Sequence, residues 1–314
     1  MSFEVNAITA LSEINDLVKT FASSELGWTV TGEDIFIPGS TNPVNITNSS
    51  GPTFNNLNFE IPSLSATIFA SLDTPRLNGT IGAPVLPSPT NLYLYGGTEE
   101  SQPFLAGIVA FGFNRYRHFY IGSMIKYGSY TGGEIIQAGY HGTGDDGDTN
   151  SLTFSKYPFG ARTSQASTLS GFVNVVHADA GDPVKVLRRG SDVGAFDGEP
   201  QGDIALGGYS DRVNSNYTDR AQQHFANASV LGPINLYATK SGLDRYFPIG
   251  RPPGVRMVNM ENIEPGVLVT ISGTDWRVFP VFRRSFSTTF TAIAGGYNAE
   301  ETSYRRGLAY PEVA

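Results

Sequence analysis

Apolar and polar residues alternate along much of the chain beyond Gly27. A period of two places every second side chain on the same face of an extended strand, whereas a helix repeats at three and four residues. The clearest of these runs place the following residues on shared faces: Leu57, Phe59 and Ile61; Val267, Val269 and Ile271; Phe286, Thr288 and Phe290. This alternation predicts a chain that is mainly β.

Glycine and proline interrupt the extended runs throughout the sequence. The 36 glycines and 19 prolines are spread over the 314 residues, and short runs at 92–95, 171–177 and 276–282 are bounded by Gly, Pro, Asn or Asp. Two stretches, 141–151 and 189–220, are polar and glycine-rich, which is typical of long loops. Short strands with frequent turn residues predict an antiparallel sandwich or barrel-like domain with long loops.

One amphipathic helix is expected near the N-terminus. Apolar residues recur there at spacings of three and four, and Thr9 stands where a helix cap is expected. The apolar positions are Leu11, Ile14, Leu17, Val18 and Phe21. Two interpretations remain: the helix packs on its own domain, or it docks as a terminal element on a neighbouring subunit.

The pattern divides the chain into three segments. Residues 1–26 carry the N-terminal helix, and residues 27–210 form a β-rich body with long loops. Residues 211–314 form a C-terminal β-rich segment, either separate or part of the same domain.

The first 210 residues carry a net charge of −10 and the remainder a net charge of +2. Surfaces of opposite charge bias would allow identical copies to associate head to tail.

Composition removes several classes of function. The chain has no cysteine, which excludes disulfides and thiolate chemistry, and its net charge of −8 disfavours sequence-specific nucleic-acid binding. No apolar run approaches the roughly 18 residues that a membrane span needs. The first residues include Glu4, Glu13 and Asp16 and lack the pattern of a secretory leader. We therefore expect a soluble protein that is made in the cytosol and does not enter a membrane.

The strongest catalytic motif is the S-x-x-K spacing of Ser123 and Lys126, which serine acyl-transfer enzymes use. That chemistry needs the lysine one helical turn after the serine. The surrounding residues are aromatic and bounded by Gly122 and Gly128, which favours a strand, on which residues three apart point to opposite faces. We therefore predict no catalytic residue and no enzyme activity.

The sequence predicts no metal site and no cofactor site. The histidines have none of the spacings of zinc ligands. They are His118, His141, His177 and His224. The loop that carries Asp145, Asp146 and Asp148 is rich in oxygen ligands but departs from the calcium-loop pattern, so calcium binding there stays an open question. The adjacent pair Glu99 and Glu100 is interpreted as solvated surface charge.

Aromatic and basic residues interleave between Phe111 and Tyr120, where Arg115, Arg117 and His118 lie among the aromatic rings. Such interleaving is compatible with a platform that stacks single-stranded nucleic acid. In an acidic chain, the favoured interpretation is a strand pair whose aromatic rings pack in the core and whose arginines reach an edge or a partner.

Two parts of the chain resemble virion structural proteins of tailed bacteriophages. The first virion-like segment is residues 115–134, with Arg-Tyr-Arg-His-Phe-Tyr-Ile-Gly followed by Lys-Tyr-Gly-Ser-Tyr-Thr-Gly-Gly-Glu. The second virion-like segment combines residues 276–281, Trp-Arg-Val-Phe-Pro-Val, with residues 306–310, Arg-Gly-Leu-Ala-Tyr, and is similar to the close of such proteins. In this second segment, Trp276 is expected to be a large buried anchor and Pro280 to end strand pairing or lie on an edge.

The resemblance implies a neck, collar, tail or head-surface component of the virion. Such a protein would act through copies of itself in a ring or collar and through contacts with other virion structural proteins. The resemblance implies no catalytic residue. The alternative function is that of a β-sandwich carbohydrate-binding or host-surface recognition protein, with aromatic residues lining a groove.

Overall fold

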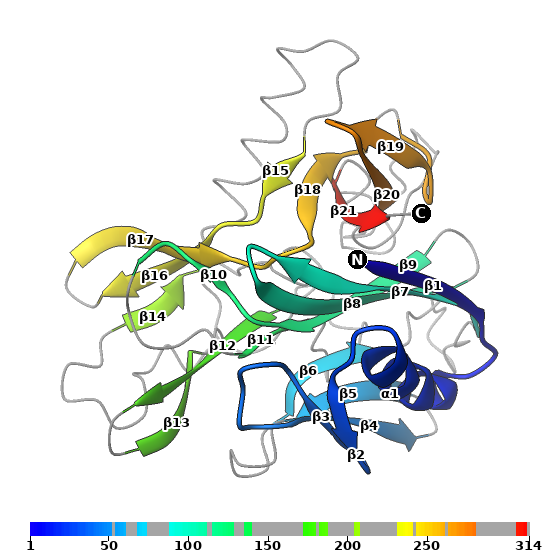
Figure 1. Cartoon of the computed structure of the whole chain (residues 1–314), viewed down its shortest axis with the longest axis horizontal. Helices are drawn as coiled ribbons and strands as arrows, with labels where there is room; N and C mark the ends of the chain where they lie inside the picture. Colours follow the sequence, from blue (N-terminus) through cyan, green and yellow to red (C-terminus); the bar gives the residue numbers. More distant parts are fainter. Residues whose placement is uncertain are drawn as a thin grey trace, which may run out of the picture.

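The computed structural model describes residues 1–51, 54–60, 68–73, 88–111, 115–128, 135–139, 172–179, 182–187, 204–207, 231–240, 243–260, 263–280 and 306–312. These residues form four antiparallel sheets and one α-helix near the N-terminus (Figure 1). The prediction of a mainly β chain with an N-terminal helix is confirmed. The described strands form layered sheets and close into no barrel. Of the two expected architectures, the sandwich and the barrel-like domain, the structure has the layered one.

A seven-stranded central sheet organises the molecule, with the order β1-β7-β8-β9-β11-β12-β13. Its strands are β1 (Ser2–Ala7), β7 (Pro89–Glu99), β8 (Gln102–Phe111), β9 (Arg115–Gly122), β11 (Ile135–Gly139), β12 (Phe172–Asp179) and β13 (Asp182–Leu187). Sequence reasoning assigned residues 1–26 to a helical segment and did not anticipate β1, which pairs with β7 before the helix begins.

Strands β8 and β9 lie in the middle of the central sheet and are covered on both faces. All residues from Pro103 to Phe111 in β8 are buried, and their sequence is a continuous run of apolar residues. A strand that alternates apolar and polar residues has one wet face, whereas a strand packed on both sides is apolar throughout. Gly107 of β8 lies opposite Phe119 of β9. The Phe119 ring occupies the space that a side chain at residue 107 would need, since a Cβ atom placed there would lie 1.9 Å from the ring.

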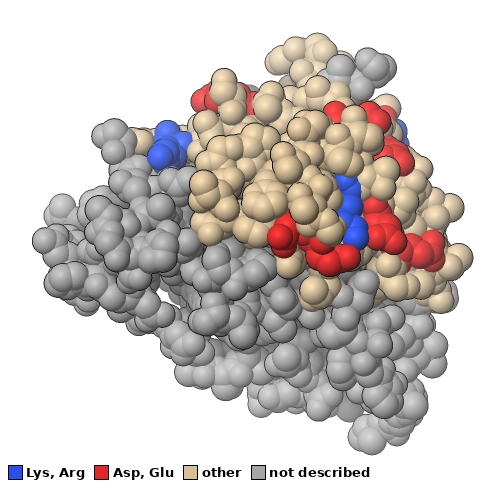
Figure 2. All heavy atoms as spheres, turned by 60° about the horizontal axis from the view of Figure 1, so that its bottom comes forward, with Lys and Arg blue, Asp and Glu red and all other residues tan. Residues whose placement is uncertain are grey.

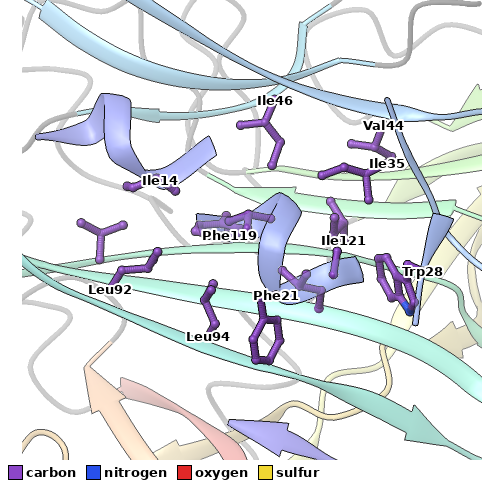
Figure 3. Packing of buried hydrophobic residues seen from close by; sticks show 14 of the residues in the cluster. Ile14, Phe21, Trp28, Ile35, Val44, Ile46, Leu92, Leu94, Phe119 and Ile121 are labelled. Atoms are coloured by element: carbon purple, nitrogen blue, oxygen red, sulfur yellow. The ribbon is translucent and has the colours of Figure 1, made fainter. Parts of the chain in front are cut away.

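The N-terminal layer covers one face of the central sheet. It consists of the 3-10 helix η1 (Leu11–Glu13), helix α1 (Ile14–Ser24) and the sheet β2 (Thr29–Thr31), β3 (Asp34–Phe36), β4 (Val44–Gly51), β5 (Phe54–Glu60) and β6 (Ile68–Asp73). Figure 3 shows Ile14 and Phe21 of the helix packed among Leu92, Leu94 and Phe119 of the central sheet. The helix therefore packs on its own chain, which decides between the two interpretations of its apolar face.

The helix start differs from the expected cap at Thr9. One oxygen of the Glu13 carboxylate accepts hydrogen bonds from the backbone N–H groups of Thr9 and Ala10 and from the Thr9 hydroxyl, at 2.7–2.9 Å. Thr9 is thus a donor to Glu13, and the carboxylate satisfies the N–H groups that precede the helix. The hydrogen bond from the Thr9 side chain is the main cause that lowers the pKa of Glu13.

The C-terminal sheet covers the opposite face of the central sheet, with the order β15-β18-β21-β20-β19 (Figure 1). Its strands are β15 (Gly232–Pro233), β18 (Arg256–Asn259), β19 (Leu268–Ile271), β20 (Thr274–Pro280) and β21 (Arg306–Glu312). A fourth sheet joins β10 (Ile125–Lys126) to β17 (Leu243–Arg251), β16 (Leu236–Lys240) and β14 (Ile204–Gly207). This pairing connects strands from both sides of the expected boundary at residue 210.

The surface of the described part is acidic around the N-terminal layer. Residues 1–51 include six Asp or Glu residues and one Lys, and Figure 2 shows more acidic than basic side chains on the face that it presents. Lys19 of α1 lies between carboxylates, with its Nζ 3.0 Å from Asp16 and 3.2 Å from Glu33.

Candidate functional site

The two virion-like segments meet at a buried junction between the central and C-terminal sheets. Along β9, Tyr116, His118 and Tyr120 face the C-terminal sheet, whereas Phe119 and Ile121 face the N-terminal layer. This division follows from the two-residue period of a strand. The junction is therefore built by side chains of the first segment that point away from the helix.

His118 is the polar centre of this junction. Its Nε2 lies 2.8 Å from the carbonyl oxygen of Pro280, and its Nδ1 lies 2.9 Å from the hydroxyl oxygen of Tyr310. Because a carbonyl oxygen only accepts, Nε2 carries the proton and donates it to Pro280. Nδ1 then accepts a hydrogen bond from the Tyr310 hydroxyl. The ring thus joins β9 to the neighbouring strands β20 and β21 of the facing sheet.

The junction is closed to solvent. His118 is 1% exposed and Tyr310 is fully buried. Burial lowers the pKa of His118 to about 4, although the hydrogen bond to Pro280 acts in the opposite direction. The imidazole is therefore neutral at pH 7, and both of its nitrogens are already hydrogen-bonded. This arrangement stabilises the packing of two sheets, and no substrate reaches the ring without separating them.

Aromatic rings surround the histidine and fill the space between the sheets. Tyr310 stacks on Tyr95 with 5.2 Å between ring centroids, and Tyr95 stacks in turn on Phe3 at 4.8 Å. Phe279 packs against Tyr93 at 4.9 Å and Tyr116 at 5.5 Å. Aromatic pairs of this kind contribute about 0.5–1.5 kcal/mol each beyond the burial of their area.

Strand β20 crosses the central sheet instead of running along one of its strands. The guanidinium of Arg277 lies 5.4 Å from the ring centroid of Phe3 in β1, and Phe279 contacts β7 and β9. Pro280 then meets His118 of β9. Successive positions of β20 therefore lie over β1, β7 and β9, as in an orthogonal packing of two sheets.

A cluster of charges closes one end of the junction, where β7 turns into β8. The Glu99 carboxylate pairs with Arg256, lies 2.8 Å from Nη2 of Arg251 and accepts a hydrogen bond of 2.7 Å from the Gly254 N–H. Burial raises the pKa of Glu99, but the hydrogen bonds from these three groups outweigh it and hold the pKa at about 2. Glu99 is therefore a partly buried link between sheets, which corrects its interpretation as solvated charge.

A second ion pair lies within the C-terminal sheet. Arg277 makes a two-pronged contact with the Glu312 carboxylate, and its Nη1 donates to the carbonyl oxygen of Gly266 at 2.7 Å. The hydrogen bond to Glu312 is the main cause that raises the pKa of Arg277. Paired charges with several hydrogen bonds hold a defined geometry, so this contact fixes β21 against β20.

Several sequence predictions change at the junction. Arg117, expected at an edge or a partner, is 3% exposed, and its Nη1 donates to the carbonyl oxygen of Tyr116 at 3.3 Å. The large buried anchor of β20 is Phe279 and not Trp276, which is only partly buried and stacks with Arg256 at 5.3 Å. Pro280 is the last described residue of β20 and lies opposite Gly307 of β21, and the residues that follow it lie outside the described part.

The S-x-x-K residues lie in no helix: Ser123 is in the link between β9 and β10, and Lys126 is in β10, so the predicted strand is interrupted at the serine. Ser123 is 5% exposed, and its hydroxyl donates to Gln102 Oε1 at 2.9 Å, while Lys126 ends the short strand β10 and is exposed. The helical turn that this motif requires is therefore not formed. The candidate calcium loop with Asp145, Asp146 and Asp148 lies outside the described residues.

The other histidines lie elsewhere. His141 and His224 are outside the described residues, and His177 is on β12, whose side chains are not described. Within the described ranges, no three His, Asp or Glu side chains are grouped as metal ligands would be. Helix α1, the α-helix of this part of the chain, is too short to cross a membrane.

No model of a protein family matches the chain, and no curated protein matches it in sequence.

Proposed function

We propose that this protein is a structural subunit of a tailed-phage virion, located at the neck, collar, tail or head surface. It assembles in the host cytoplasm from symmetric copies and docks to neighbouring virion proteins. The observation that supports this proposal is the meeting of the two virion-like segments at His118, Pro280 and Tyr310, although 162 and 192 residues separate the bonded pairs along the chain.

The contact between the two virion-like segments supports the proposal, because both segments belong to one structural feature, the junction around His118, and not to two unrelated places in the fold. Short similar segments at unrelated places in a fold are easily coincidental. Here the first segment supplies the histidine, and the second supplies both of its hydrogen-bond partners. A sheet-to-sheet junction of this kind maintains a rigid shape, which is the property that a particle subunit needs.

The proposal is tested on particles. Tailed phages are purified from a lysate of the bacterium that expresses the gene, and their proteins are identified by mass spectrometry. Immunogold labelling with antibodies against the purified chain then locates the protein on the particle. We expect several copies per particle at one station. A chain that is absent from purified particles but abundant in the lysate would refute the proposal.

One observation favours the alternative of carbohydrate recognition. Tyr127 is 46% exposed, and its hydroxyl donates to Asn235 Oδ1 at 2.7 Å, which fixes the ring at the surface. A fixed aromatic face is a suitable platform for a sugar ring. Selective binding to a glycan array that is lost in Tyr127→Ala would support this function, and equal binding by both proteins would exclude this ring as the platform.

A further inference from the structure

The central sheet ends in two edge strands, β1 and β13, each of which pairs on one side only among the described strands. An edge strand presents unpaired N–H and C=O groups to which another strand can add. Proteins protect such edges with proline, lysine or bulges. Strand β13 contains Pro183 and Lys185, and its pairing with β12 is irregular near its start. Strand β1 has no proline and no lysine, so it is the open edge.

The hydrogen bonds of β1 show which of its backbone groups point outward. The N–H of Ile8 donates to the carbonyl oxygen of Thr90, at the position where β1 continues beside β7. In an antiparallel pair, alternate residues face the neighbouring strand. Ser2, Glu4 and Asn6 therefore bond to β7, and the backbone groups of the following residues point to the open edge: Phe3, Val5 and Ala7.

Apolar side chains are exposed along the same margin. Val5 is 47% exposed at the centre of β1. Leu268 of the edge strand β19 is 44% exposed and lies opposite Arg277, whose guanidinium is over Phe3 of β1. The margins of two layers thus present unpaired backbone and apolar surface together.

We propose that β1 pairs antiparallel with β1 of a second copy of this chain, with the two-fold axis at Val5. In this register Val5 lies opposite Val5 of the other copy, Phe3 opposite Ala7, and Glu4 opposite Asn6. All outward backbone groups from Phe3 to Ala7 become paired. The exposed valines cover each other, and each Glu4 faces an amide that can donate a hydrogen bond.

The neighbouring registers are less favourable. Moving the axis to Glu4 places two like charges directly opposite each other in a closely spaced pair, which destabilises a strand pair. Moving it to Asn6 pairs fewer residues and leaves Phe3 without a partner. Because β1 opposes itself without conflict and β13 carries protective residues, an isologous pair is favoured over head-to-tail pairing of β1 with β13. This inference deepens the proposed function and rests on it for the expectation that copies associate.

Light scattering after size-exclusion chromatography, over a series of concentrations, tests the pairing. We expect a concentration-dependent dimer for the wild type. Val5→Pro removes an N–H that points outward and makes no bond to β7, so it should preserve the fold and raise the dissociation constant at least about tenfold, because symmetry removes that donor twice. Val5→Thr keeps the N–H and the β-branch and should still dimerise.

A cysteine cross-link tests the position of the axis independently of any effect on folding. The chain has no cysteine, so Val5→Cys introduces a single thiol per copy. Residues opposite each other in a hydrogen-bonded antiparallel pair have Cα atoms about 5.5 Å apart, within disulfide range. Mild oxidation should give a covalent dimer with Val5→Cys. The control Tyr127→Cys, which places a thiol at a similarly exposed site, should stay monomeric on a denaturing gel.

The outcomes separate this inference from the proposed function. A wild type that is monomeric at all concentrations, or a dimer that Val5→Pro leaves intact and Val5→Cys does not cross-link, would overturn the pairing through β1. If the chain is nevertheless found in particles, the proposed function stands without this contact. If the chain dimerises as expected but is absent from particles, the pairing through β1 stands and the proposed function as a virion subunit is refuted.

Discussion

Acid should weaken the junction between the sheets through His118. Its pKa is about 4 in the folded protein and about 6.5 in an unfolded chain, because burial disfavours the charged ring. Above pH 6.5 neither state binds the proton, and the neutral ring contributes its full stability. As the pH falls from about 6.5 to about 4, only the unfolded state takes up the proton. With about 1.36 kcal/mol per pH unit, the free energy of unfolding should decrease by about 3 kcal/mol over this range.

The variant His118→Gln isolates this effect. The glutamine amide can still donate to the carbonyl oxygen of Pro280, but the Tyr310 hydroxyl loses its acceptor. We therefore expect the free energy of unfolding of the variant to be about 1–3 kcal/mol below that of the wild type at pH 7. Glutamine does not titrate, so the variant lacks the acid-induced loss. The difference between the two proteins should therefore shrink by about 3 kcal/mol between pH 7 and pH 4, and the variant should become equal or superior in stability.

Urea unfolding at a series of pH values measures this difference, followed by the fluorescence of Trp28 and Trp276. Trp28 reports on the core beneath the helix and Trp276 on the C-terminal sheet. Tyr310→Phe is the control, since it removes the same hydrogen bond but keeps the buried histidine and hence the pH dependence. A wild-type to His118→Gln difference that stays constant from pH 7 to pH 4 would falsify the assignment of a neutral, buried imidazole.

Three further predictions concern positions away from the histidine. Gly254→Ala should lower the free energy of unfolding by about 3 kcal/mol or more, because a φ of +66° is unfavourable for alanine and the added Cβ would lie 2.0 Å from an aromatic ring. Gly273→Ala is the control: its φ is +79° but the space around it is open, so it should cost only about 1–2 kcal/mol in the same urea titration. Glu99→Gln should lower stability by about 1–3 kcal/mol at pH 7, because it removes the carboxylate that Arg256 and Arg251 share and leaves Arg251 with only its exposed partner Glu100. The wild type should lose this contribution as the pH falls from about 4.5 to about 2, and a variant with an unchanged acid transition would contradict the lowered pKa. Phe21→Ala should cost about 3–5 kcal/mol by opening a cavity under the helix, whereas Lys19→Ala should be nearly neutral by thermal unfolding, and equal losses would show that the helix does not pack through its apolar face.

Local patterns determined the class of the fold and many of its elements. The alternation at 267–271 predicts a strand that the structure places at β19, and the three-and-four spacing from Leu11 to Phe21 predicts the region of helix α1. These patterns can be read from the sequence because one face of α1 is buried and one face of β19 is partly buried, while the opposite face of each element is exposed. The strands on either side of Ser123 were predictable for another reason, since aromatic residues are enriched in strands and glycines commonly bound them.

Other features depended on what covers each face, which a period does not encode. Strand β8 is buried on both sides because the N-terminal layer covers one of its faces and the C-terminal sheet covers the other, and β1 is a strand because it pairs with the edge of β7. The opposite fates of Glu99 and Glu100 follow from the turn between β7 and β8, which points only the first toward Arg256.

The mainly β architecture, its turns and its N-terminal helix were thus determined by the sequence itself, through the spacing of apolar residues and the positions of glycine and proline. Only the tertiary structure decided that His118 meets Pro280 and Tyr310, that Phe279 and not Trp276 is the buried anchor, and that β1 is an edge strand among the described strands. The physical reason is that these contacts join residues far apart in the chain, and their partners are set by how whole sheets cross and pair.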